Sequence, residues 1–193
     1  MANTAKHNRD EVIQKATWLF WEKGFHATSM RDLQDRVDLR PGSIYAAFGS
    51  KEGLFKEALK FYVQDSFEQL NSCTEKFSPL QALKQFFISV VLCNEEQRPT
   101  EACMLVKTLT ELPPENADLI DEARGYLKGM EDLFASLLSQ AQETGELDPS
   151  KDSRRLARYL QMQLMGLRAY ARTNADKESV KQLIDDVFES AQF

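Results

Sequence analysis

The chain has 193 residues, of which 42% are hydrophobic and 28% charged, and it carries a net charge of −6; such a chain buries a substantial core and is not expected to be disordered. The longest apolar run, FFISVVLC, is far shorter than the roughly 18 residues of a spanning helix, and the first residues lack the apolar core of a secretory signal, so we expect a cytoplasmic protein with no membrane partner. Three cysteines without zinc-site spacing and only two histidines argue against a disulfide framework, a metal site or a cofactor.

The negative charge is unevenly distributed along the chain. Residues 1–60 hold ten lysines and arginines against eight acidic residues, whereas the remainder holds 14 against 22. A mildly basic N-terminal third therefore precedes a strongly acidic body. This asymmetry permits an N-terminal module that binds an anion such as nucleic acid.

The first predicted helix lies within residues 9–23. Apolar side chains recur there with the spacing of an amphipathic helix, at Val12, Ile13, Ala16, Leu19 and Phe20. Gly24 follows as a residue suited to the left-handed conformation that commonly ends a helix.

Two short helices are predicted next. Thr28 or Ser29 begins the first of them as an N-cap, with Asp32 one turn further on. The Pro-Gly pair at residues 41–42 interrupts it and opens a helix of about two turns, which Gly49 ends. Two short helices joined by a tight turn and braced by a longer helix form a helix-turn-helix, whose second short helix enters the DNA major groove.

The rest of the chain is also predicted to be helical. Ser50 begins a long fourth helix, and further helices are expected over residues 78–94, 101–111, 115–144, 152–173 and 177–190. No strand pattern, repeat or low-complexity tract is found. The predicted fold is therefore all-α, with a helix-turn-helix domain over residues 1–49 and a second helical domain over residues 50–193.

The stretch GFHATSMRDLQDRVDLRPGSIYAAFGSKEGLF resembles the N-terminal signature of the tetracycline-repressor (TetR) family of bacterial transcriptional regulators. The resemblance extends from Val12 to Leu59, and the remainder is similar only in being helical and of the expected length. It implies a DNA-binding regulator rather than an enzyme, namely a repressor whose operator binding is relieved by a small-molecule effector. The second domain would then bind the effector and pair two chains.

The resemblance also implies DNA contacts. Ser29 and Ser43 are expected to offer hydroxyls to phosphates, Tyr45 to contact the DNA backbone, and Lys51 to bind a phosphate. Arg31 lies where some members of the family read a guanine. The full predicted set is Ser29, Arg31, Arg40, Gly42, Ser43, Tyr45, Ala46 and Lys51.

This chain departs from the family at Ala46-Ala47, where many members have bulky aromatic residues or histidine. Methyl groups touch thymine methyls but cannot hydrogen-bond. We therefore expect base reading to depend on Arg31, Arg40 and DNA shape. Three alternatives stay open: Tyr45 as a core residue, Lys51 as a first-turn lysine without a DNA partner, and Arg40 as a solvated turn residue.

Two apolar stripes near the end of the chain are candidates for pairing two copies. Helix-turn-helix proteins usually read two half-sites of a palindromic operator as dimers. The predicted homodimer interface comprises Leu156, Leu160, Leu164, Leu167, Leu183 and Val187. Two such helices from each chain would make a four-helix interface around a two-fold axis, unless the stripes close the chain's own core.

The middle helices are expected to enclose an effector pocket, because the resemblance implies one. The unknown effector would be small and apolar, since no buried acids or histidines indicate a charged ligand. The candidate lining residues are Phe86, Phe87, Cys103, Met104, Tyr126, Met130 and Phe134, each of which is alternatively a plain core residue.

Cys103 suggests an alternative trigger, namely reaction with an electrophile. If Thr100 caps the next helix, the thiol lies in the first turn, where the helix dipole lowers a thiol pKa. The segment ACMLVK also resembles the surroundings of the sensing cysteine in the N-ethylmaleimide-responsive branch of the family. Against this, Glu95, Glu96 and Glu101 would raise the thiol pKa, and a buried cysteine is usually inert.

Two rival functions are weaker. An enzyme would need a catalytic set, and the chain shows no Ser/His/Asp set or phosphate-binding glycine loop, with both histidines before residue 27. An interaction module with a vestigial helix-turn-helix is the other rival. Salt-dependent binding to duplex DNA separates the regulator from both.

Overall fold

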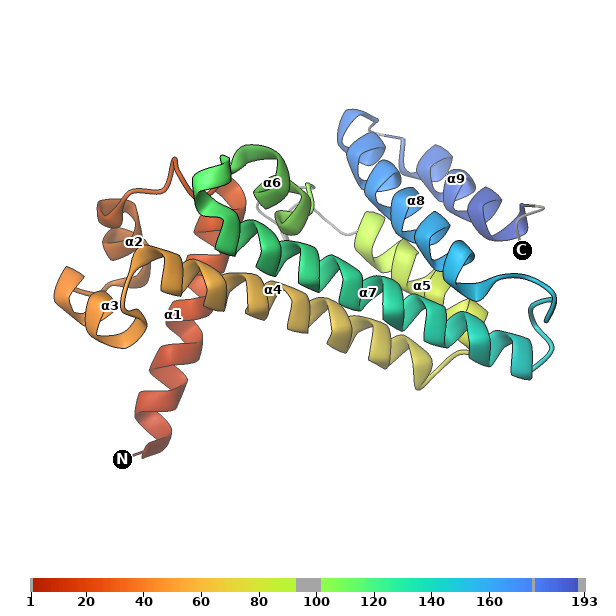
Figure 1. The fold of residues 1–193 in the computed structure, drawn as a ribbon, viewed down its shortest axis with the longest axis horizontal. Coiled ribbons are helices and arrows are strands. Elements are labelled where there is room, and N and C mark those ends of the chain that lie inside the picture. The colour runs from red at the N-terminus through yellow and green to blue at the C-terminus, as the bar shows by residue number, and fades with distance from the viewer. Residues whose placement is uncertain (1, 93–101, 175, 191–193) are drawn as a thin grey trace. The chain divides into compact units, whose positions relative to one another are not determined.

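The computed structural model describes residues 2–92, 102–174 and 176–190. Within these ranges every regular element is a helix and no strand occurs (Figure 1), which confirms the all-α prediction. The helices are α1 (Ala2–Lys23), α2 (Met30–Val37), α3 (Pro41–Phe48), α4 (Lys51–Thr74), α5 (Pro79–Val91), α6 (Met104–Glu111), α7 (Ala117–Glu143), α8 (Ser153–Thr173) and α9 (Lys177–Glu189), with a 3-10 turn over Pro114–Asn116 before α7.

Most predicted helix limits lie within three residues of the observed ones. The largest difference is at α1, which begins at Ala2 rather than near residue 9, so the apolar stripe that predicted it covers only its second part. Helix α6 begins at Met104, and Cys103 therefore directly precedes it instead of lying in its first turn. The predicted cap, Thr100, lies outside the described residues.

One compact unit combines Met1–Asp65 with Met104–Gly125, and so contains α1 to α3, most of α4, all of α6 and the start of α7. Its core is aromatic: the ring of Phe55 lies 4.9 Å from that of Phe20 and 5.0 Å from that of Phe25. Met104 is almost completely buried beside these rings. Helix α6, distant in sequence, thus shares a core with the helix-turn-helix.

The second compact unit combines Ser66–Cys103 with Tyr126–Phe193. Helices α8 and α9 lie side by side, and α5 packs against both (Figure 1). Phe87 is fully buried at the centre, with its ring 5.1 Å from that of Phe188 and 6.2 Å from that of Phe134. These edge-to-face and tilted contacts are the arrangements that aromatic pairs prefer.

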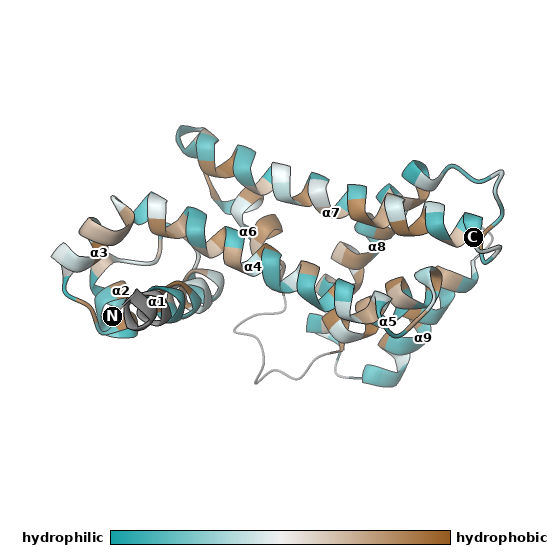
Figure 2. Cartoon of the chain, turned by 90° about the horizontal axis from the view of Figure 1, so that it is seen from below, coloured by the Kyte–Doolittle hydropathy of each residue, from teal (hydrophilic) through white to brown (hydrophobic). Residues whose placement is uncertain are grey.

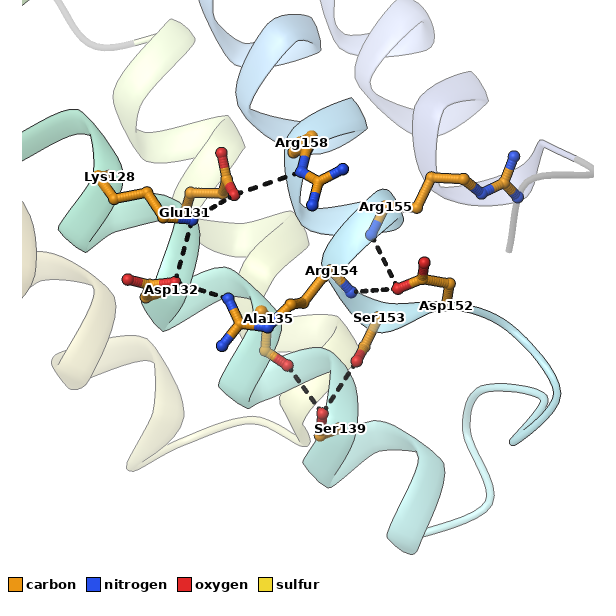
Figure 3. A network of polar contacts seen from close by, with 10 residues as sticks. All are labelled: Lys128, Glu131, Asp132, Ala135, Ser139, Asp152, Ser153, Arg154, Arg155 and Arg158. Carbon is orange, nitrogen blue, oxygen red and sulfur yellow. Dashed lines mark hydrogen bonds and ion pairs between the residues drawn. The ribbon is translucent and has the colours of Figure 1, made fainter. Parts of the chain in front are cut away.

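Charged side chains join α7 to α8 on the surface of the second unit (Figure 3). Lys128 Nζ lies 2.7 Å from Glu131 Oε1 and 3.3 Å from Asp132 Oδ1. Arg154 reaches the same Asp132 carboxylate at 2.9 Å, and Arg158 approaches Glu131 at 3.6 Å. Since most of these groups are exposed, each pair adds little stability.

Hydropathy follows the two-sided pattern of packed amphipathic helices. Along α4 and α7, Figure 2 shows hydrophilic and hydrophobic residues interleaved, as expected for helices with one buried side. Among the described residues, no helix combines the length and hydropathy that crossing a membrane requires.

Candidate nucleic-acid interface

Helix α2 begins with a reciprocal cap, which confirms Ser29 as its N-cap. Ser29 Oγ accepts a hydrogen bond from the Asp32 backbone N–H at 3.1 Å, and the Ser29 backbone N–H donates to Asp32 Oδ2 at 2.8 Å. The Ser29 hydroxyl also donates to Asp32 Oδ2. This capping box satisfies donors that a helix start otherwise leaves unpaired.

A short turn then redirects the chain from α2 to α3. Asp38 ends α2 in the left-handed conformation, with a φ of 53°. Arg40 is the N-cap of α3, and Pro41 follows at the first helical position, where its fixed φ fits and its missing N–H is not needed. Ile44 of α3 and Leu33 of α2 are both fully buried, so the two short helices pack on an apolar centre.

The opposite face of α3 is open to solvent. Gly42, Ser43, Tyr45 and Ala46 are all exposed, and the Tyr45 side chain is 49% accessible, so Tyr45 is not a core residue of this chain. Figure 2 colours α3 mainly in pale and brown tones. An exposed face with small side chains and hydroxyls lets a helix approach base edges and phosphates closely.

Three cationic side chains of the predicted DNA-contacting set lie in the same compact unit as this face. Arg31 and Arg40 are exposed on α2 and at the start of α3. Lys51, at the start of α4, places its Nζ 4.4 Å from the centre of the Phe25 ring, a cation–π geometry. Burial lowers the pKa of the Lys51 ammonium. The predicted DNA-contacting residues thus lie on α2, α3 and the start of α4 within one compact unit.

The loop between α1 and α2, residues 24–29, is closed by its own hydrogen bonds. Gly24 has a φ of +85°, and its carbonyl accepts a 2.7 Å hydrogen bond from Thr28 Oγ1. Lys23 Nζ donates to Asp32 Oδ1 at 2.6 Å. Hydrogen bonds from Lys23 and Ser29 hold the pKa of the Asp32 carboxyl well below its usual range. The end of α1 is thereby tied to the start of α2.

Arg9 is a residue that the sequence analysis did not single out. Its guanidinium lies 4.9 Å from the centre of the Phe48 ring, at the end of α3, and 3.1 Å from Glu57 Oε1 on α4. These contacts join α1 to α3 and α4 across almost fifty positions of sequence, so no local pattern reveals them. Beside them lies a groove of about 310 Å³, lined by Arg9, Ala47, Phe48, Gly53, Lys56, Glu57, Lys60 and Glu122.

The predicted effector residues fall in two different units. Phe86, Phe87 and Phe134 are fully buried in the core of the second unit, with Met130 packed against that core. Tyr126 is partly buried on α7. Met104 instead belongs to the core of the unit that carries the helix-turn-helix.

The two described cysteines are both half-buried. Burial raises the pKa of the Cys73 thiol, as expected for an inert cysteine. Cys103 is half-buried immediately before α6. The neighbouring acidic residues Glu95, Glu96 and Glu101 lie outside the described residues. In the ranges that the structure covers, no group of three or more His, Cys, Asp or Glu side chains is placed to hold a metal ion.

The residues of the predicted dimer interface separate into buried and exposed sets. The buried ones, in the core of the second unit, are Leu156, Leu160, Leu167 and Val187, with Leu164 packed against them. Leu183 is 39% exposed. Two further large apolar side chains, Met162 and Tyr170 on α8, are 60% and 46% exposed.

Comparison with known proteins places the chain in a family. It matches the bacterial regulatory proteins of the tetR family over residues 12–58 and the tetracyclin repressor-like C-terminal domain over residues 79–187. The chain belongs to the TetR family. The resemblance seen in the sequence is thereby confirmed, and with it a transcriptional regulator rather than an enzyme.

Relatives of this TetR-family regulator extend over most of its length. The HTH-type transcriptional repressor ComR of Escherichia coli (strain K12) is 31% identical over 180 residues, which cover 91% of this chain and 85% of ComR. The HTH-type transcriptional repressor DhaR of Mycobacterium sp. (strain GP1) is 23% identical over 184 residues, 94% of this chain and 91% of DhaR. A cysteine mutant of the TetR family regulator CifR, complexed with 26-bp double-strand operator DNA, has a TM-score of 0.84 and 26% identity, covering 94% of this chain and 95% of that one.

Proposed function

We propose that this regulator is a cytoplasmic repressor that binds a palindromic operator as a homodimer and releases it when an effector binds. The observation that carries the proposal is the exposed face of α3, which follows a capped α2 in a unit that also carries the exposed cations Arg31 and Arg40. The repressors ComR and DhaR and the operator complex of CifR support it.

The contacts we propose follow from where each group lies. Arg31 and Arg40 are long, exposed cations that reach base edges or phosphates, and a bidentate arginine prefers guanine. Ser43 and Tyr45 present exposed hydroxyls to the DNA backbone. Gly42 and Ala46 let the helix backbone come close to the groove. Ser29 and Lys51 contribute phosphate contacts at the starts of α2 and α4.

A homodimer would use the outward side of α8 and α9. Met162, Tyr170 and Leu183 are large apolar side chains left exposed in the single chain, and a partner copy would cover them. The buried leucines of the same helices pack into the core of the chain, on the side away from this exposed surface. Pairing two helices from each copy places two α3 helices on one duplex, as palindromic half-sites require.

The effector site is proposed for the second unit, among the aromatic residues around Phe86 and Phe134. A small apolar molecule suits such a lining. Its binding would change the separation of the two helix-turn-helix domains and so weaken operator binding. The alternative trigger is modification of Cys103 by an electrophile.

The decisive experiment is selection of duplexes from a random DNA pool by the purified chain, followed by affinity measurements. We expect an enriched palindrome. Tyr45→Phe removes only one hydroxyl and should weaken operator binding about fivefold, the effect of one lost hydrogen bond. Tyr159→Phe, at a half-buried tyrosine of α8 that none of the proposed contacts uses, is the matched control and should bind normally. No enriched sequence, or equal effects of both variants, would contradict the proposal.

The alternative trigger has its own test. Treatment with N-ethylmaleimide should release operator from the unaltered chain and from Cys73→Ser, because burial raises the pKa of the Cys73 thiol and so lowers its reactivity. Cys103→Ser should bind operator normally and resist the reagent. If the Cys103→Ser variant is released as readily as the unaltered chain, Cys103 is not the trigger.

A further inference from the structure

Helix α6 holds the end of α1 through the side chain of Lys107. Lys107 Nζ donates to the backbone carbonyls of Glu22, at 2.9 Å, and Trp21, at 3.2 Å. The last carbonyls of a helix have no partner within it, and they form the negative end of its dipole. A lysine 85 positions away in sequence therefore supplies both hydrogen bonds and charge at the end of α1, with its side chain only 17% exposed.

Glu111, one turn further along α6, occupies the space that Gly24 leaves open. A Cβ atom at Gly24 would lie 2.4 Å from Glu111 Oε2 and 3.4 Å from Lys107 Cε. Glu111 Oε1 is also 3.8 Å from Lys107 Nζ. The first residue of the α1–α2 loop is thus in direct contact with the side chains that bind the end of α1.

The contact is also tightly packed on its apolar side. Met104 and Thr108, on the same helix as Lys107, are 1% and 4% exposed. They line, with Phe20 and Phe25 of the helix-turn-helix domain, a cavity of only about 10 Å³, room for about one water. Because little space remains, α6 cannot shift along α1 without disturbing this core.

The path from this contact to the DNA-contacting surface is short. The α1–α2 loop runs directly into the capping box that starts α2, and α3 follows after one turn. Within the loop, Thr28 fixes the Gly24 carbonyl. The carbonyls of Trp21 and Glu22, three and two residues before Gly24, accept hydrogen bonds from Lys107. Lys107 of α6 thus bonds the last turn of α1, directly before the loop that leads to α2.

We propose that Lys107 is a positioning residue for operator recognition: by binding the end of α1 it holds the α1–α2 loop in the conformation that presents α2 and α3 to DNA. The proposal rests on the proposed function, because it assigns Lys107 a part in operator binding without any contact to DNA. It predicts a loss of specific binding rather than of general attraction to DNA, which depends on exposed cations.

The test compares three variants of the full chain. Lys107→Met keeps the apolar stem and removes the ammonium, whereas Lys107→Arg keeps donors for both carbonyls. Lys84→Met is the matched control, since Lys84 is also partly buried and paired, with Nζ 2.8 Å from Asp185 Oδ1, but lies in the other unit. Each variant is titrated with the selected operator and with an unrelated duplex, and amide hydrogen exchange is followed at residues 24–29.

Lys107→Met should bind operator about tenfold more weakly, the effect of losing hydrogen bonds from a charged donor, with little change on the unrelated duplex. Exchange at residues 24–29 should be faster by a similar factor. Lys107→Arg should stay within about threefold of the unaltered chain, and Lys84→Met should match it.

Unchanged operator affinity and exchange in Lys107→Met would overturn the proposal, as would an equal loss in Lys84→Met. If the unaltered chain enriches no operator at all, the proposed function fails instead. The exchange rates then still decide whether Lys107 holds the loop. The two ideas can therefore fail separately.

Discussion

Substitutions at Ser29 separate its role in folding from its role in binding DNA. Its side-chain oxygen accepts from the Asp32 backbone N–H at 3.1 Å, so Ser29→Ala leaves a first-turn donor unpaired. Loss of such a cap costs about 1 kcal/mol, whereas glycine at this position costs only a few tenths. Asparagine caps as well as serine does. Stability should therefore fall in the order serine or asparagine, then glycine, then alanine.

The assay is urea unfolding followed by tryptophan fluorescence. Trp18 and Trp21 are the chain's two tryptophans, and both lie on α1, in the same compact unit as Ser29. The signal thus reports the unit that the substitution affects. Equal stability of the alanine variant and the unaltered chain would refute the capping argument.

Operator binding by the same variants gives a different order. A hydroxyl has one donor hydrogen and can accept as well, so Ser29 can turn its hydrogen from Asp32 to a phosphate while still accepting from the Asp32 N–H. Glycine keeps most of the stability but has no hydroxyl. Ser29→Gly should therefore bind operator about fivefold more weakly, one hydrogen bond's worth, despite its near-normal stability. Normal affinity in Ser29→Gly would show that the hydroxyl makes no phosphate contact.

Three further predictions concern the same domain. The pKa of the Asp32 carboxyl is lowered in the folded chain, so its contribution to stability is present above the unfolded pKa of about 3.9 and is lost as pH falls through the folded pKa. Asp32→Asn should therefore flatten the fall of the urea midpoint with decreasing pH below about pH 4. An unchanged dependence of the urea midpoint on pH would contradict this. Gly24→Ala should cost about 1–2 kcal/mol in urea unfolding, because a residue with a φ of +85° is strained unless it is glycine; a neutral result would argue against that conformation. Lys51→Met should reduce the slope of log affinity against log salt by about 0.9, the share of one phosphate, and an unchanged slope would mean that the ammonium has no phosphate partner.

The helix-turn-helix could be predicted from sequence because its determinants are local. The Ser29–Asp32 cap, the Pro-Gly pair at residues 41–42 and the glycines that follow α1 and α3 all act within a few positions of the structure they specify. The contacts of Lys107 and Arg9 have no such signature. Each bridges dozens of positions, and helical spacing gives no information about the partner of a side chain.

The apolar stripes of α8 and α9 are a second case in which helical spacing does not reveal what a side chain packs against. Periodicity identified Leu156 and Leu160 as lying on an apolar side, but it does not distinguish a chain's own core from a dimer interface. In the structure both are buried within the single chain, while Met162 and Leu183 of the same helices stay exposed. Only the packing of α5 against α8 and α9 decides which side is already covered.

The helix-turn-helix is not complete without α6. A fragment ending near residue 49 would lose Met104 from its aromatic core and Lys107 from the end of α1, since both come from Met104–Glu111. The chain recruits α6 across residues 66–103, and the entropy cost of closing such a segment grows only slowly with its length. The core of the DNA-binding domain therefore includes a helix that directly follows Cys103 in the chain.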